Sequence, residues 1–399
     1  MGRNGSERLT SPRDVRLLVV ARTIRAFGFG FASILIGIHL QSRSLSPTEI
    51  GIALSTGLAA ASLSGLLSAA ASSRFGRRKT LTAIGLLMAA SGCDLAFATP
   101  QWLLILASLT GMMGVAGTDN GPFLAVEQTA LTQAATARNR NRAFARYSLA
   151  GALGAAAGGF SASLGAGPMS TTVFFLVFAL IGVTTAMIPL FLSDNVEGEA
   201  GTRAFGSLKP LIGLSALFAV DSLGSGLVTS SVMVYWLHVK FGATPALLGP
   251  VFGAMSILAA LSFELSGRIA DRIGLVNTMV FTHLPSNFLL VLIPFVPGLA
   301  FVLAILIVRS TVVSMDQPAR QAYVVSIVPS NERSGALAFT GAVRGMASAA
   351  GPVITGAAIQ AASFVFPFVT AGALKAAYDI TLYISFRRRF GDHELARRS

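Results

Sequence analysis

An all-α polytopic membrane protein, with twelve transmembrane helices in two pseudo-symmetric six-helix bundles, is the fold class that this sequence predicts. Apolar residues make up 53% of the 399 positions and charged residues only 12%, a balance that does not suit a water-soluble surface. The apolar residues gather in runs as long as a bilayer core requires. The second half of the chain also repeats the glycine, proline and arginine positions of the first.

A hydrocarbon core of about 30 Å needs roughly 20 apolar residues for each helical span. Such runs follow one another along almost the whole chain, and short polar segments separate them. The twelve predicted spans cover residues 17–40, 50–71, 81–98, 102–126, 147–167, 171–192, 211–239, 247–265, 275–296, 299–315, 336–362 and 364–386.

An internal repeat appears when the second half is placed over the first. The coincident pairs at a shift of 198 are Pro47 and Pro245, Gly51 and Gly249, Gly28 and Gly226, Arg74 and Arg272, and Gly76 and Gly274. Later in each half Asp119 meets Asp316, and Gly158 meets Gly351. We therefore expect an N-terminal bundle over residues 1–193, a solvated cytoplasmic linker over residues 194–209, and a C-terminal bundle over residues 210–399.

The formal net charge of +13 does not indicate nucleic-acid binding, because the basic residues lie on one side of the predicted spans. Segments such as 74–79 and 138–146 hold clusters of them, whereas the predicted outer loops hold only Arg43 and Lys240. This bias places the basic turns and both termini in the cytoplasm of a plasma (inner) membrane. The same clusters also suit anionic lipid headgroups.

The ends and the cysteine content add two expectations. Residues 1–16 are polar, and no small-residue cleavage site follows a short apolar core, so no cleaved signal peptide is expected. The single cysteine, Cys93, rules out an internal disulfide and a cysteine-paired metal site. No phosphate-binding loop, nucleophile elbow or dinucleotide fingerprint is present, so we expect neither an enzyme nor a bound cofactor.

The turn after the eighth span resembles the cytoplasmic turn that is the hallmark of the major facilitator superfamily. Its spaced residues are Gly267, Asp271, Arg272 and Gly274. The resemblance implies a gating turn: the glycines let backbones approach closely, and the carboxylate pairs with a basic group or a helix N-terminus of the neighbouring bundle. The first-half turn keeps Arg74, Gly76 and Arg77 but has Ala69 and Ser73 at the leading glycine and the aspartate.

Other features of that family have counterparts here. The segment from Pro329 to Arg333 resembles the turn between helices ten and eleven, and Arg140 is its first-half equivalent. Gly351 and Pro352 resemble the glycine-proline pattern that antiporters of the family carry in helix five, whereas Gly158 stands in the fifth span without the proline. Packing of small residues between helices explains both glycine patterns equally well.

Ionisable residues within the spans are candidate functional groups, because each costs several kcal/mol to bury. The family fold implies that helices one, four, seven and ten line a central cavity. The candidates for proton or substrate binding are Arg25, Asp119, Glu127, Asp221, Arg309, Asp316 and Arg320. Asp221 and Arg309 each lie ten residues into their spans, which is about 15 Å along a helix and close to the midplane.

These ionisable groups differ in whether an oppositely charged residue lies three or four positions away on the same helix. Asp316 and Arg320, like Lys375 and Asp379, are four residues apart and would neutralise each other within one helix. Asp119, Glu127 and Asp221 have no basic residue three or four positions away, so they are the better proton carriers.

Each of the remaining candidates keeps an alternative role. Glu127 could pair with Arg146 or another arginine at the cytoplasmic rim, and Asp119 could serve as a cap or a hinge beside Asn120. The stem of Arg25 would extend to the cytoplasmic interface, or its head would bind an anionic substrate. His39 and His238 end the first and seventh spans, but their spacing defines no metal site, and none is predicted.

These features together predict a secondary transporter that exports a small organic or amphipathic solute by alternating access, coupled to protons. An exporter of an anion or a metal ion is one alternative, and a transporter-derived sensor without net flux is another. The expected partners are a small-molecule solute, protons and the lipid bilayer, without nucleic acid, and the chain is expected to be a monomer.

Overall fold

The structure is a computed structural model that describes residues 11–98, 100–118, 121–135, 139–165, 168–197, 209–329 and 333–386. Regular structure in these ranges is entirely helical, without a β-strand, which confirms the predicted fold class. Eight of the helices or joined helix pairs are long and apolar enough to cross a membrane. The order of the helices is compatible with twelve spans.

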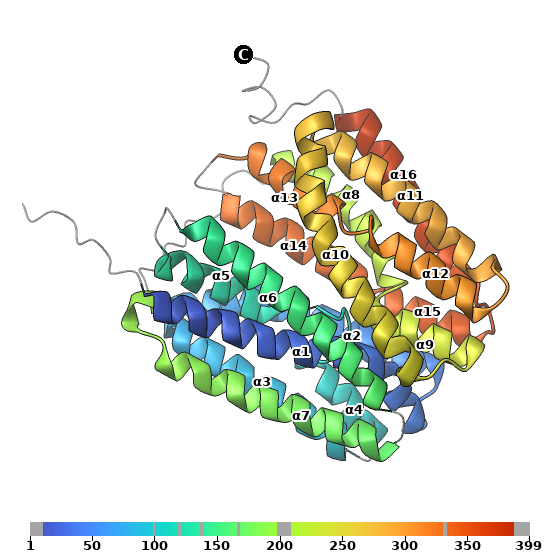
Figure 1. The fold of residues 1–399 in the computed structure, drawn as a ribbon, viewed down its shortest axis with the longest axis horizontal. Coiled ribbons are helices and arrows are strands. Elements are labelled where there is room, and N and C mark those ends of the chain that lie inside the picture. The colour runs from blue at the N-terminus through green and yellow to red at the C-terminus, as the bar shows by residue number, and fades with distance from the viewer. Residues whose placement is uncertain are drawn as a thin grey trace, which may run out of the picture.

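The helices of the first half are α1 (Pro12–Ser42), α2 (Pro47–Phe75), α3 (Arg77–Phe97), α4 (Gln101–Ser108), α5 (Pro122–Ala134), α6 (Arg140–Ser161) and α7 (Pro168–Met187), with short 3-10 turns η1 (Ala162–Leu164), η2 (Ile188–Phe191) and η3 (Asp194–Glu197). Those of the second half are α8 (Lys209–Gly226), α9 (Ser230–Phe241), α10 (Pro245–Ile273), α11 (Leu275–Leu292), α12 (Leu299–Ser310), α13 (Asp316–Ser326), α14 (Arg333–Ala349), α15 (Gly351–Gln360) and α16 (Phe366–Phe386), with η4 (Ile293–Phe295) after α11. The helices of each half form one bundle (Figure 1).

The long helices α2 and α10 begin and end in equivalent ways. Each has a proline in its first turn, which fits the free N–H positions there. Ser46 and Glu49 form a capping box at the start of α2. Each helix ends at a glycine with positive φ, 91° at Gly76 and 88° at Gly274, where a side chain would be strained. The arginine-bearing turns follow at these two glycines.

Four predicted spans are interrupted rather than continuous. The predicted span 102–126 is divided into α4 and α5 by an irregular segment, and the glycines at 111, 114 and 117 adopt φ values near 70° there. The predicted spans 211–239, 299–315 and 336–362 break between α8 and α9, after α12, and between α14 and α15. Irregular backbone at membrane depth is tolerated where it is buried in protein or lines a cavity.

The bundles pack against each other at the end where α2 and α10 begin, which we call the packed end. Gly51 of α2 approaches the Pro352 carbonyl of α15 so closely that a Cβ there would lie 2.5 Å from the oxygen. Gly249 of α10 makes the equivalent approach to α6, where its Cβ would lie 2.8 Å from the Gly159 carbonyl oxygen. These contacts obey the internal repeat, because α2 meets α15 as α10 meets α6.

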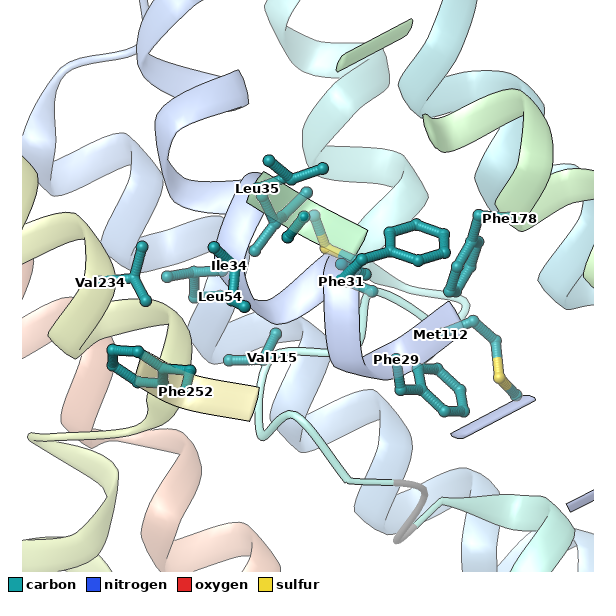
Figure 2. Close-up of a cluster of buried hydrophobic side chains, with 14 of the residues drawn as sticks. Phe29, Phe31, Ile34, Leu35, Leu54, Met112, Val115, Phe178, Val234 and Phe252 are labelled. Atoms are coloured by element: carbon teal, nitrogen blue, oxygen red, sulfur yellow. The ribbon is translucent and has the colours of Figure 1, made fainter. Parts of the chain in front are cut away.

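Apolar side chains from both bundles join in one core near the packed end. Figure 2 shows Val234 and Phe252 of the second bundle beside Ile34, Leu54 and Val115 of the first. A second apolar cluster lies wholly within the C-terminal bundle, around Phe218 and Tyr378. The shared core therefore closes the region between the bundles at the packed end, away from the arginine-bearing turns.

Candidate functional site: buried charges in the two bundles

In the N-terminal bundle, Glu127 of α5 pairs with Arg25 of α1. The two side chains form a bidentate ion pair, with nitrogen–oxygen distances of 2.7 and 2.6 Å, and both are almost fully buried. The Tyr147 hydroxyl donates a further hydrogen bond of 2.6 Å to Glu127, and the Phe123 ring lies 4.0 Å below the guanidinium. This arrangement satisfies the carboxylate with charge-assisted bonds on both oxygens.

This geometry corrects two expectations. Arg25 does not extend to an interface, because it is 0% exposed and holds Glu127 inside the bundle. Glu127 pairs with Arg25 and not with Arg146 at the rim. Local spacing could not predict this pair, since 102 positions separate its members. The pair balances both charges within the N-terminal bundle.

In the C-terminal bundle, Asp221 of α8 joins several helices. Its carboxylate lies 2.8 Å from Lys375 Nζ of α16 and 3.2 Å from Arg320 of α13. The His283 ring of α11 approaches the same carboxylate at 3.7 Å. Asp221 has no basic neighbour on its own helix, but the fold surrounds it with three groups from other helices.

Asp379 of α16 has a different set of partners. The His283 ring nitrogen Nδ1 lies 2.9 Å from the Asp379 carboxylate, and the Asn287 amide donates to it at 2.8 Å. His283 thus stands between two buried carboxylates, Asp379 and Asp221. We call His283, Asp221, Asp316, Arg320, Lys375 and Asp379 the C-bundle cluster.

Only one of the two expected intrahelical pairs forms. Asp316 and Arg320 are in contact at 2.9 Å. Lys375 and Asp379 do not pair as expected, because Lys375 bonds to Asp221 and to the Ser225 hydroxyl while Asp379 bonds to His283. Spacing of four residues allows such a pair, but oppositely charged groups on neighbouring helices compete for it.

Arg309 lies at the end of α12, 9% exposed, where its Nε donates to the Ser286 carbonyl at 3.3 Å. Asp119 lies outside the described residues. The segment before Asp119 contacts α9 of the other bundle. The Ser231 hydroxyl donates to the Val115 carbonyl at 2.9 Å, and the Ser230 hydroxyl donates to the Ala116 carbonyl at 3.3 Å. This interrupted part of the fourth span therefore holds the bundles together.

The two gating turns differ in structure. In the second half, Gly267, Asp271 and Arg272 are exposed beside Gly274. In the first half, Glu197 of η3 accepts hydrogen bonds from the Arg77 and Arg78 backbone N–H groups, the latter at 3.1 Å. Glu197 thus supplies at the N-terminus of α3 the carboxylate that Ser73 does not.

Further bonds fix η3 to this turn. The Arg77 guanidinium donates to the Val196 carbonyl, and Arg78 pairs with Asp194 at 2.7 Å. The first-half turn is thus bound to the chain that follows its own bundle. Arg74 is exposed beside the Phe75 ring.

Replacing Glu197 by alanine is expected to lower the free energy of unfolding by about 1–2 kcal/mol, because two N–H groups at the start of α3 lose their acceptor. Asp194→Ala is the matched control and should cost less than about 1 kcal/mol, since an exposed ion pair contributes little. Denaturant unfolding in mixed micelles measures both. Equal effects in the two variants would contradict the capping role.

The helix-packing residues lie at close contacts between helices. Gly158 of α6 packs on the Phe27 carbonyl of α1. Gly351 of α15 packs on Gly226 at the end of α8. Gly351 and Pro352 also begin α15 directly after the interruption at Ala350. Arg140 and Arg333 each begin a helix, α6 and α14, at equivalent places in the repeat, and their side chains lie outside the described part of the structure.

His39 and His238 contact backbone oxygens. His39 lies 2.8 Å from the Leu95 carbonyl, and His238 lies 2.8 Å from the Ala243 carbonyl. Among the described residues, no group of three or more histidine, cysteine, aspartate or glutamate side chains is placed to hold a metal ion.

His283 is the functional candidate that sequence reasoning missed. It lies eight residues into α11, in the middle of an apolar span, and an ionisable residue there is itself a sign of function. Asn287, four residues further on, lies on the same face of the helix and could have strengthened the signal.

Comparison with known proteins identifies the family. A sequence profile of the Major Facilitator Superfamily matches residues 18–308 and, in a second match, residues 214–397. The chain belongs to this superfamily. As a Major Facilitator Superfamily protein it is a multi-pass membrane transporter and not an enzyme.

An uncharacterised membrane protein of Saccharomyces cerevisiae is 22% identical to this superfamily member over 390 residues, which cover 86% of this chain and 87% of the yeast protein. A bacterial homologue of the human lysosomal transporter Spinster, solved inward-facing and occupied, has a TM-score of 0.76 at 14% identity, with 94% and 97% of the two chains covered. A mutant of the nucleoside transporter NupG has a TM-score of 0.74 at 14% identity, with 93% and 99% covered. At such identities the two structures support the shared fold.

Proposed function

We propose that this transporter exports a small organic solute by alternating access and that protons drive it through the C-bundle cluster. The observation that carries the proposal is the placement of His283 between the carboxylates of Asp221 and Asp379, all three at most 3% exposed. Histidine is the side chain that ordinarily changes charge between about pH 5 and pH 8. A proton taken up here changes the charge of a site that joins α8, α11, α13 and α16.

The charge balance links protonation to movement. Asp221 attracts Lys375 and Arg320 from two other helices. A proton on His283 adds a positive charge beside the same carboxylate, which offsets part of its charge and repels the two cations, so it weakens the attraction that holds α13 and α16 to α8. Such a change favours one of two bundle arrangements over the other. The Arg25 and Glu127 pair does not take part in this scheme, because its charges are already matched within the N-terminal bundle.

The orientation belongs to the same proposal. The arginine-bearing turns at Arg74 and Arg272 would lie in the cytoplasm together with both termini, as basic loops do in plasma-membrane proteins. The packed end would then face outward, and the present arrangement would receive solute from the cytoplasm. Loading from that side is what an exporter requires, and the apolar side chains near the packed end suit an amphipathic solute.

The test begins with a thermal-shift screen of the purified protein against drugs, organic anions and divalent metals. The strongest stabiliser is then used in proteoliposomes with an imposed pH gradient. We expect gradient-driven flux in the wild type, and its loss in His283→Gln with counterflow exchange retained. Glu264→Gln is the control, because Glu264 is exposed and pairs only with Arg268 among the described residues. Binding without any flux would contradict the proposal and favour a sensor.

A further inference from the structure

The C-terminal bundle holds more cations than its carboxylates can pair. Four basic side chains lie within it, one on each of α12, α13, α14 and α16: Arg309, Arg320, Arg344 and Lys375. Three carboxylates face them, from Asp221, Asp316 and Asp379. The described part of this bundle interior therefore carries an excess positive charge even while His283 is neutral.

The contacts in the structure show which of these basic side chains have a carboxylate partner and which have none in the described ranges. Lys375 and Arg320 lie against Asp221, and Arg320 also pairs with Asp316. Arg309, in contrast, bonds only to the Ser286 carbonyl, and Arg344 bonds only to the Ser222 hydroxyl at 3.1 Å, counting partners in the described ranges. Each of these bonds uses Nε, so both guanidinium groups have further N–H donors to offer.

The two arginines differ in burial. Arg344 is partly exposed and precedes Gly345, which packs against Ser62 of the other bundle, so it lies beside the boundary between the bundles. Arg309 is 9% exposed and lies one residue before the end of α12, where the tenth span is interrupted. Arg344 bonds to Ser222, which follows Asp221 on α8, and Arg309 bonds to Ser286, which lies three residues after His283 on α11, so both lie beside the C-bundle cluster.

We propose that Arg344 and Arg309 bind an oxyanion group, a carboxylate or a phosphate, on the transported solute. A guanidinium group that is buried, as in Arg309, or half-buried, as in Arg344, is costly without a hydrogen-bonded carboxylate, and a solute oxyanion would relieve that cost. Arginine presents paired N–H donors that match the two oxygens of such a group. The inference rests on the proposed transport function and names its substrate class: an organic anion with an apolar remainder.

Binding is tested without a gradient, so that its result does not depend on proton coupling. The probes are benzoate, phenyl phosphate and the neutral analogue benzamide, and the readout is the melting temperature of the purified full chain. We expect benzoate or phenyl phosphate to raise it and benzamide to leave it unchanged. Arg344→Gln and Arg309→Gln should each weaken anion binding by roughly ten- to a hundredfold, because a charge-assisted bond is lost.

Controls separate a binding role from a structural one. Arg268→Gln, at an exposed turn, should bind the anions as the wild type does. Arg344→Lys keeps the charge without the planar fork, so it should fold and bind with intermediate affinity. Anion responses that survive in both glutamine variants, equal responses to benzamide, or no response to either anion would overturn the inference.

Further outcomes distinguish binding of a solute anion from binding of a lipid headgroup, and anion binding from proton coupling. Competition by phosphatidylglycerol in mixed micelles that displaces phenyl phosphate would assign the arginines to a lipid headgroup and overturn the solute assignment. Anion binding that persists in a protein without gradient-driven flux would sustain the inference while contradicting proton coupling. Gradient-driven flux of neutral solutes alone would support proton coupling and contradict the inference of anion binding.

Discussion

Replacing Asp221 by asparagine is expected to lower the free energy of unfolding by about 3–5 kcal/mol, because it removes the partner of two buried cations. Lys375, at 2.8 Å, loses its carboxylate entirely, while Arg320 keeps Asp316. The same variant should lose gradient-driven transport. Unfolding in mixed micelles and flux in proteoliposomes measure the two effects.

The double variant Asp221→Asn/Lys375→Met is the matched control. It removes one charge of each sign, so most of the stability should return while transport stays lost. If the free energy of unfolding of Asp221→Asn lay within about 0.5 kcal/mol of the wild-type value, the C-bundle cluster would not hold the bundle together. Differences of that size are expected between sites that do not interact.

Placing leucine at Gly51 or Gly249 is expected to open the packed end. A Cβ at Gly51 would already lie 2.9 Å from Val353 Cα, and one at Gly249 would lie 2.8 Å from the Gly159 carbonyl oxygen, so the backbones must separate. Overpacking of about 1–3 kcal/mol would reduce the population of this arrangement roughly five- to a hundredfold. Counterflow exchange should fall accordingly.

Accessibility of Ser231 reports on the opening directly. In a Cys93→Ser background, a Ser231→Cys variant should resist a membrane-impermeant maleimide while the packed end is closed, because Ser231 is 0% exposed. Adding Gly51→Leu should make it reactive. Gly341→Leu is the control, since a Cβ at Gly341 meets open space. Unchanged labelling in the Gly51 variant would contradict the role of this contact.

Sequence reasoning predicted what depends on local pattern. Apolar runs marked the spans, and the repeated Gly51 and Gly249 are the residues at the two equivalent contacts between the bundles. The interruptions were not predicted, because Gly111, Gly114 and Gly117 are compatible with an apolar helix and show their φ values near 70° only in the fold.

Less of the charged site could be predicted from the sequence. Spacing along one helix predicted the pair of Asp316 and Arg320, but the partners of Asp221 come from helices far away in the chain. Glu197 is a similar case: it takes the place of an acid missing from the first-half turn but comes from 120 positions further along. Such substitutions are set by tertiary packing and leave no local pattern.

The central claim is that protonation of the C-bundle cluster shifts the bundles between two arrangements. Spin labels at Arg74→Cys and Arg268→Cys, in the Cys93→Ser background, report the distance between the C-terminal ends of α2 and α10, which lead into the two arginine-bearing turns. Between about pH 8 and about pH 5, the window in which histidine titrates, we expect two distance populations to exchange weight in the wild type and to stay fixed in His283→Gln. A single distance that does not respond to pH in the wild type would contradict the account.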